Sequence, residues 1–227
     1  MLIIAGVWFA TRLGSGMLRS PFAPTPTSTR TINSLALEGE TQFKAGALNL
    51  AIAAYQQAVA QSDASDPQVW IELARIQTYS SRLLSNDSDR LARLTEALQS
   101  ANQAVTLAPE DSNAHAVRSF VLDWNADPAL DPLRTDGKAA ADFIFEAEQA
   151  AVRAISLDRQ NPLALAYYAE ILVDEQKWDQ ADLYITPALD LGPLVMDVHR
   201  IYGYYLESTR NYRQAIEEYQ RALEINP

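Results

Sequence analysis

One helical pattern recurs along this chain and constrains its fold more than any other feature. Near the C-terminus, Ala215, Tyr219 and Ala222 are followed by Pro227, and similar spacing occurs four times upstream. Offsets of 0, 4 and 7 lie on one face of a helix with about 3.6 residues per turn. Alanine there allows a neighbouring helix to approach closely, and proline ends the helix because it lacks a backbone donor. The upstream copies are Ala181/Ile185/Ala188/Pro193, Ala147/Ala151/Ala154, Ala97/Ala101/Ala104/Pro109 and Ala51/Tyr55/Ala58.

A second stripe with helical spacing precedes each copy. The last three copies of the alanine pattern, which begin at Ala147, Ala181 and Ala215, follow one another at intervals of 34 residues. Each repeat therefore predicts two helices joined by a short connection. The preceding stripes are clearest at His199/Tyr202/Gly203/Leu206, Leu165/Tyr168/Ala169/Leu172 and Trp70/Leu73/Ala74/Gln77.

These residues and their interval resemble the tetratricopeptide repeat (TPR) family, whose pattern is a large residue, Leu-Gly, Tyr, Ala, an aromatic, Ala and Pro. The resemblance covers residues 32–227 and implies an all-α fold, a right-handed superhelical solenoid of antiparallel helix pairs. The two C-terminal copies are complete, whereas the second and third are interrupted by insertions. The five repeats are expected at about residues 32–66, 67–110, 111–161, 162–195 and 196–227.

The insertions lie around "SSRLLSNDSDRL" and "NADPALDPLRTDGK", and each precedes an unusually long helical pattern, at 87–107 and 137–157. The segment from Ser85 to Ser88 supplies side chains that can cap the first of these helices. We expect the two long helices to pack on each other and form a ridge midway along the solenoid.

Residues 1–19 form an apolar N-terminal segment, and residues 20–31 form a linker rich in proline and threonine. The run "MLIIAGVWFA" is shorter than the roughly 20 residues of a membrane-spanning helix, and no basic residue precedes it as in a signal peptide. A truncated membrane anchor, an unusual export signal and an apolar terminus all fit. We expect membrane association through this segment, and otherwise a cytoplasmic protein. The following arginines favour a cytoplasmic C-terminal side, whereas such linkers often precede exported domains, so the side stays open.

Composition excludes several classes of function. The net charge of −11 and the presence of only three lysines argue against binding to a nucleic-acid backbone. Cysteine is absent, which removes thiolate chemistry and zinc sites that use cysteine. The two histidines, His115 and His199, fall in packing positions, and no phosphate-binding or hydrolase motif is present. We therefore predict a non-enzymatic protein with no catalytic residues, no cofactor and no metal.

One acidic stretch resembles a calcium-binding loop. "DWNADPALD" places Asp123, Asn125, Asp127 and Asp131 at offsets 1, 3, 5 and 9. Proline replaces the glycine of the sharp turn, and an arginine stands where the bidentate glutamate is required. The stretch is therefore expected to be an acidic surface loop.

The family resemblance implies that the first helix of each repeat lines a concave groove, which typically holds an extended or helical peptide. The lysine and asparagine clamp of the chaperone-tail-binding subset is absent, because Ala36 and Glu40 stand in those positions. A partner with basic and apolar groups would suit the acid-leaning groove. The candidate groove residues are Glu40, Phe43, Arg75, Tyr79, Ser119, Leu122, Asp123, Glu170, Val173, Asp174, Arg200, Tyr204 and Glu207.

The expected function is a protein–protein interaction scaffold that binds a peptide or protein partner. The alternative is a regulatory or targeting module of a larger, truncated enzyme or membrane-anchored assembly. Neither the partner's identity nor the oligomeric state is set by the sequence. In the last helix, Ile216, Tyr219 and Leu223 would face a following helix. We therefore expect a fragment, or a partner that covers this end.

Overall fold

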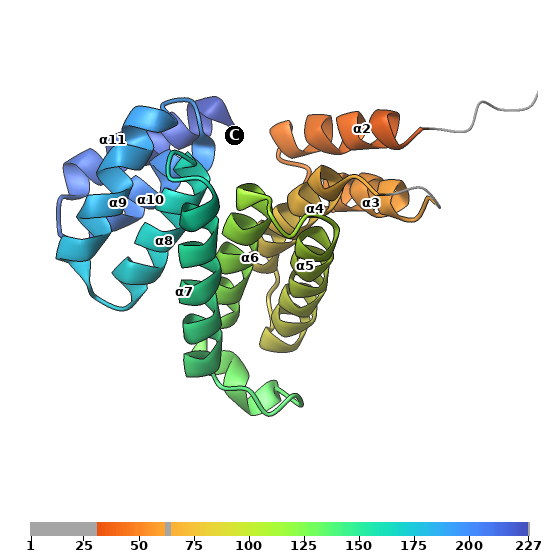
Figure 1. Cartoon of the computed structure of the whole chain (residues 1–227), viewed down its shortest axis with the longest axis horizontal. Helices are drawn as coiled ribbons and strands as arrows, with labels where there is room; N and C mark the ends of the chain where they lie inside the picture. Colours follow the sequence, from red (N-terminus) through yellow and green to blue (C-terminus); the bar gives the residue numbers. More distant parts are fainter. Residues whose placement is uncertain (1–30, 62–64, 227) are drawn as a thin grey trace, which may run out of the picture. The chain divides into compact units, whose positions relative to one another are not determined.

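The computed structural model describes residues 31–61 and 65–226, which belong to the structural unit that begins at Thr31. The described residues form α-helices and one 3₁₀ helix, and no strand occurs among them (Figure 1). The elements are α2 (Ile32–Lys44), α3 (Leu48–Val59), α4 (Pro67–Ser81), α5 (Asp87–Leu107), α6 (Ser112–Asn125), η1 (Pro128–Leu133), α7 (Ala140–Leu157), α8 (Pro162–Asp174), α9 (Trp178–Leu191), α10 (Met196–Ser208) and α11 (Tyr212–Ile225).

Consecutive helices pack as pairs: α2 with α3, α4 with α5, α6 with α7, α8 with α9, and α10 with α11. The first helices of successive pairs also contact one another from α4 through α6 and α8 to α10. The predicted fold class, a solenoid of antiparallel helix pairs, is confirmed.

The alanines of the repeated pattern lie between helices, as predicted. Ala181 and Ala188 are fully buried, and Ala215 and Ala222 are only 3% and 6% exposed. A glycine serves the same purpose on the facing helix. A Cβ atom on Gly203 would lie 2.8 Å from the ring of Tyr219. The small residues therefore allow each aromatic ring to lie directly on the neighbouring backbone.

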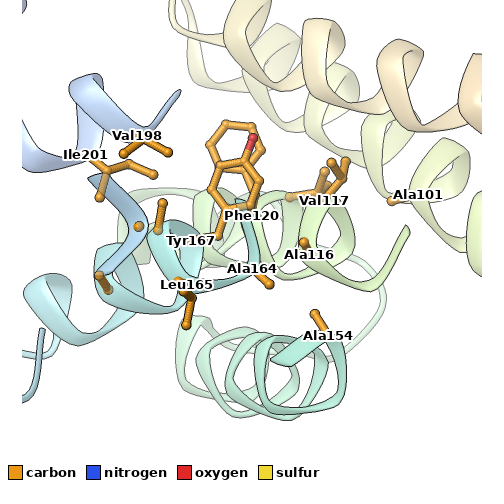
Figure 2. Close-up of a cluster of buried hydrophobic side chains, with 14 of the residues drawn as sticks. Ala101, Ala116, Val117, Phe120, Ala154, Ala164, Leu165, Tyr167, Val198 and Ile201 are labelled. Atoms are coloured by element: carbon orange, nitrogen blue, oxygen red, sulfur yellow. The ribbon is translucent and has the colours of Figure 1, made fainter. Parts of the chain in front are cut away.

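A central core runs through the middle helices. Phe120 of α6 stacks on Tyr167 of α8, with ring centroids 4.6 Å apart and an interplanar angle of 16°. Figure 2 shows this pair between Val117 on one side and Val198 and Ile201 of α10 on the other. All five side chains are buried, so the core ties α6, α8 and α10 into one packed layer.

In the first, fourth and fifth repeats, the turn between the two helices has a residue in the left-handed backbone conformation. Gly46, Gln176 and Arg210 occupy equivalent places after α2, α8 and α10, with φ angles of 71°, 61° and 66°. Glycine adopts this conformation without a Cβ clash, whereas the other two residues are strained there.

The expected ridge of long helices is wrong. The helix over 87–107 is confirmed as α5, capped by the Asn86 side chain, which accepts a hydrogen bond from Asp89 N at 2.8 Å. Helix α7 begins at Ala140, three residues later than expected. The two long helices lie on either side of α6 (Figure 1). Helix α6 separates them because it is apolar on both flanks, with Val121 in the central core and Leu122 packed among residues of α7.

The last helix exposes apolar side chains. Ile216 and Leu223 are 57% and 61% exposed, as the sequence predicts, whereas Tyr219 is half-buried against Gly203. Among the described helices, none is long and apolar enough to cross a membrane. The apolar segment 1–19 and residues 20–30 of the linker lie outside the described residues, so the expected membrane anchor stays a prediction.

Candidate functional site

The first helices of the second to fifth repeats border a hollow of about 1030 Å³, which we call the groove. Helix α4 contributes Tyr79, α6 contributes Trp124, α8 contributes Asp174, and α10 contributes Arg200 and Tyr204. Because these helices follow one another side by side, equivalent positions in successive repeats converge on one surface.

The structure divides the predicted groove residues into three groups. The first group lines the groove: Tyr79, Asp123, Glu170, Val173, Asp174, Arg200 and Tyr204. The second group, Glu40, Phe43 and Arg75, lines a separate hollow of about 650 Å³ bordered also by residues 194–196 and 225–226. The remaining residues, Ser119, Leu122 and Glu207, line neither hollow.

The side chains of the last group are either buried within the fold or hydrogen-bonded to another helix. Ser119 and Leu122 are fully buried because α6 is covered on several sides, and the Ser119 hydroxyl donates to Ala116 O at 2.7 Å. The Glu207 carboxylate accepts a hydrogen bond from the Tyr219 hydroxyl at 2.8 Å. The two buried side chains are therefore correctly placed on α6 but inaccessible to a partner.

A buried carboxylate that sequence reasoning missed organises one side of the groove. Asp197, at the start of α10, is fully buried and accepts hydrogen bonds from Arg75 Nη1 at 2.6 Å and Tyr167 at 2.8 Å. The Tyr79 hydroxyl donates to the same carboxylate. Burial would raise the pKa of Asp197, but the charges of Arg75 and Arg200 and the two tyrosine hydroxyls outweigh it and hold that pKa below its ordinary value. Helices α4, α8 and α10 are thereby joined by one polar cluster.

Arg200 forms the second fixed element of the groove. Its Nη1 and Nη2 atoms donate to the two carboxylate oxygens of Glu170 at 2.7 and 2.6 Å. Its guanidinium carbon lies 5.5 to 5.7 Å from the ring centroids of Tyr79, Phe120 and Trp124. The guanidinium is thus held by a bidentate ion pair and three aromatic rings. Trp124, which sequence reasoning also missed, in turn donates from Nε1 to Glu170 Oε1 at 3.3 Å.

Two further carboxyl groups meet at the groove and are called the acid pair, Asp123 and Asp174. Asp123 is only 5% exposed, and neither of its carboxylate oxygens has a hydrogen-bond partner among the described residues. Burial, followed by the negative charges of Asp174 and Glu170, raises the pKa of Asp123 well above its usual range.

Asp174 lies at the C-terminal end of α8 and is exposed as a residue, but its carboxyl group faces the groove. It accepts a hydrogen bond from the Tyr204 hydroxyl at 2.5 Å. Loss of water around the carboxyl group, opposed by this hydrogen bond and aided by the charge of Glu170, raises the pKa of Asp174 to about 6.

The acidic loop does not gather its carboxylates around a cation. Asp127 caps η1 by accepting from Ala129 N at 2.9 Å and pairs with Arg90 Nη2 at 2.8 Å. Asp131 pairs instead with Arg134 at 3.4 Å. Within residues 31–61 and 65–226, no three histidine, aspartate or glutamate side chains are grouped to hold a metal ion.

The two histidines are held by the chain itself. The ring nitrogens of His199, a buried residue, lie 2.7 Å from Glu218 Oε2 and 3.0 Å from Pro193 O. The Nε2 atom of His115 lies 2.9 Å from Pro109 O. These three contacts join helices or connections, which is the structural role that the sequence predicts for each histidine.

Paired helices, nested small residues and a groove formed by equivalent helix positions define a helical repeat protein. The predicted resemblance to tetratricopeptide repeats is confirmed by comparison with known proteins. The family model for the tetratricopeptide repeat matches residues 201–227. A comparison with curated protein sequences found no match.

A comparison with solved structures found matches at low sequence identity. TTC0263, a thermophilic TPR protein of Thermus thermophilus, has a TM-score of 0.64 and 16% identity, over 86% of this chain and 91% of its own. MamA has a TM-score of 0.45 and 16% identity, over 86% and 92% of the two chains. YrrB, described as a TPR protein with an unusual peptide-binding site, has a TM-score of 0.45 and 14% identity, over 96% and 91%. The likeness to TTC0263 shows the fold.

Proposed function

We propose that this chain is a non-enzymatic interaction scaffold that binds a peptide, or an extended segment of a protein, in the groove between α4, α6, α8 and α10. The observation that carries this proposal is the fixed arrangement of the groove around Arg200. Its ion pair with Glu170 and its contacts with three rings hold the side chains of different repeats in place before any partner arrives. Such preorganisation reduces the entropy lost on binding.

The size and lining of the groove favour a polypeptide over a small molecule. Its volume of about 1030 Å³ lies just above the range for small-molecule pockets, about 300–1,000 Å³. It is lined by aromatic side chains that remain partly accessible, among them Trp124, Trp178 and Tyr204. Aromatic side chains of this kind are frequent binding hot spots in protein interfaces.

The negative charge of the groove favours a partner with basic side chains. The groove is lined by the carboxyl groups of Asp123, Asp127, Glu170, Asp174 and Glu175, and the whole chain has a net charge of −11. A nucleic-acid backbone would be repelled. A segment with basic and apolar side chains would be attracted and would bury the aromatic surface.

The proposal can be tested by selecting peptides from a random display library against the full chain and measuring their affinities by calorimetry. Tyr204→Ala removes a half-buried ring from the groove, whereas the matched variant Tyr212→Ala removes an exposed ring from α11. We expect the first variant to weaken binding of the selected peptides at least about tenfold and the second to leave it unchanged. Equal affinities for both variants would contradict binding in the groove.

A further inference from the structure

We infer that the acid pair, Asp123 and Asp174, is a subsite for one basic side chain of the bound segment. This inference rests on the proposed function and names the chemistry that the groove would recognise. It concerns one part of the groove, at the ends of α6 and α8, where Tyr204 of α10 closes the third side.

The first observation is an unpartnered buried carboxylate. Buried polar groups in proteins are nearly always hydrogen-bonded, yet both oxygens of Asp123 lack a partner among the described residues. The residue is 5% exposed and lines the groove. A donor supplied by a partner would complete the hydrogen bonding of this group.

The second observation is that three cations near the groove are already paired with other carboxylates. Arg200, opposite the pair on α10, donates both terminal nitrogens to Glu170. Arg90 on α5 pairs with Asp127, and the side chain of Lys177 pairs with Glu175 at 2.8 Å. None of these cations is bonded to Asp123, so the pair retains negative charge that the chain does not neutralise.

Arg82 at the end of α4 also borders the groove. Its guanidinium carbon lies 5.7 Å from the ring centroid of Trp124, the residue that follows Asp123. The same ring faces Arg200 at 5.7 Å. Guanidinium groups of the chain itself thus lie over the aromatic surface beside the acid pair.

The third observation is like-charge crowding. The Asp123 and Asp174 carboxyl groups lie close enough to share a hydrogen bond when one is protonated, and Glu170 adds a further negative charge. Two such groups cannot both ionise at low cost. An incoming guanidinium or ammonium group would allow both to ionise, and it would replace the proton that otherwise occupies the pair.

This exchange sets the expected dependence on pH. The groups that face the pair are Glu170 on α8, Glu175 in the following turn, and Arg200 and Tyr204 on α10. Because the pKa of Asp174 is raised to about 6, affinity for a cation should fall as the pH decreases through that value. Binding at neutral pH should release protons, because burial also raises the pKa of Asp123.

The test uses N-acetyl-arginine amide, N-acetyl-lysine amide and the neutral analogue N-acetyl-citrulline amide as probes. Each is titrated into the full chain while the indole N–H signal of Trp124 is followed by NMR. We expect saturable shifts with the arginine and lysine probes, stronger for arginine because of its planar fork of donors. Citrulline amide, which has nearly the same shape but no charge, should bind at least about tenfold more weakly.

Two variants that each remove one negative charge serve as a matched comparison. Asp123→Asn should weaken binding of the arginine probe at least about fivefold, and Asp174→Asn should have the same effect. Glu224→Gln, on the exposed surface of α11, should leave affinity unchanged. Equal binding of citrulline and arginine amides, no saturable binding, or unchanged affinity in both aspartate variants would overturn the inference.

Failure of this inference and failure of the proposed function give different results. If the display-selected peptides lack Arg and Lys but still require Tyr204, the subsite is wrong and the groove proposal stands. If the arginine probe binds as expected while no selected peptide is sensitive to Tyr204→Ala, the subsite stands and the groove proposal fails.

Discussion

Arg75 Nη1 lies 2.6 Å from Asp197 Oδ2, although 122 positions separate the two residues in the sequence. Arg75 belongs to the first helix of the second repeat and Asp197 to the first helix of the fifth. Their contact joins α4 to α10 directly, without passing through the helices between. It adds a long-range constraint to an architecture in which contacts between neighbouring repeats usually dominate.

Removal of this carboxylate should destabilise the fold strongly. Asp197→Ala would leave the buried Tyr167 and the partly buried Arg75 and Tyr79 without their shared acceptor. Removing one partner of a buried ion pair typically costs about 3–5 kcal/mol. We expect a loss of that size in urea unfolding, and less than about 0.5 kcal/mol for Asp190→Ala on the exposed face of α9. Equal stabilities of the two variants would show that the cluster does not stabilise the fold.

The acid pair should make stability depend on pH in a specific direction. The pKa of Asp123 is raised by burial and that of Asp174 to about 6, so the folded state binds protons more tightly than the unfolded state. Their ionisation therefore destabilises the fold above about pH 6, and this penalty disappears as the pH falls toward the unfolded values near 4.

Asp123→Asn removes one of the two charges and is expected to stabilise the fold at pH 8. The gain should reach about 1 kcal/mol or more, the free energy of one pKa unit, and should shrink toward zero near pH 4. Urea unfolding at pH 4, 6 and 8 measures it. A stabilisation that grows as the pH falls would contradict the assignment.

The packing of Gly203 against Tyr219 predicts whether Gly203→Ala raises or lowers the unfolding free energy. In a solvent-exposed helix, Gly→Ala stabilises by about 1 kcal/mol. Here the new Cβ would lie 2.8 Å from the Tyr219 ring, so Gly203→Ala should instead destabilise by about 1–3 kcal/mol. Adding Tyr219→Leu should recover part of the loss, which a double-mutant cycle of unfolding free energies would show. Stabilisation by the single variant would mean that α10 and α11 do not nest as described.

The turn after α10 offers a stabilising change. Arg210 adopts a φ angle of 66°, whereas Gly46 occupies the equivalent turn of the first repeat with 71°. Arg210→Gly should relieve the Cβ clash and raise the unfolding free energy by about 0.5–1 kcal/mol, and Gly46→Ala should lower it by about 1 kcal/mol or more. Thermal melting of both variants would measure these two changes. A destabilised Arg210→Gly variant would contradict the turn geometry.

The repeat fold could be predicted because its determinants are local. Ala181 and Ala188 lie at fixed intervals along one helix, and the period alone places them at a contact between helices. Tyr204 could likewise be assigned to the groove because it lies off the packing stripe of its own helix. These inferences need only the periodicity of single helices.

The missed features depend on how successive repeats are placed relative to one another. Asp197 of α10 meets Arg75 of α4, and no interval in the sequence marks residues that far apart as neighbours. The unpartnered state of Asp123 depends equally on where the surrounding cations find their own partners. The expected ridge failed for a related reason, because α6 lies between α5 and α7.

The most direct test of the account is an amide chemical-shift map of the full chain with a display-selected peptide. If the peptide binds in the groove, the largest changes will fall on α4, α6, α8 and α10, centred on Trp124, Asp174 and Tyr204. Changes confined to the exposed apolar face of α11, around Ile216 and Leu223, with the groove residues unperturbed, would contradict it.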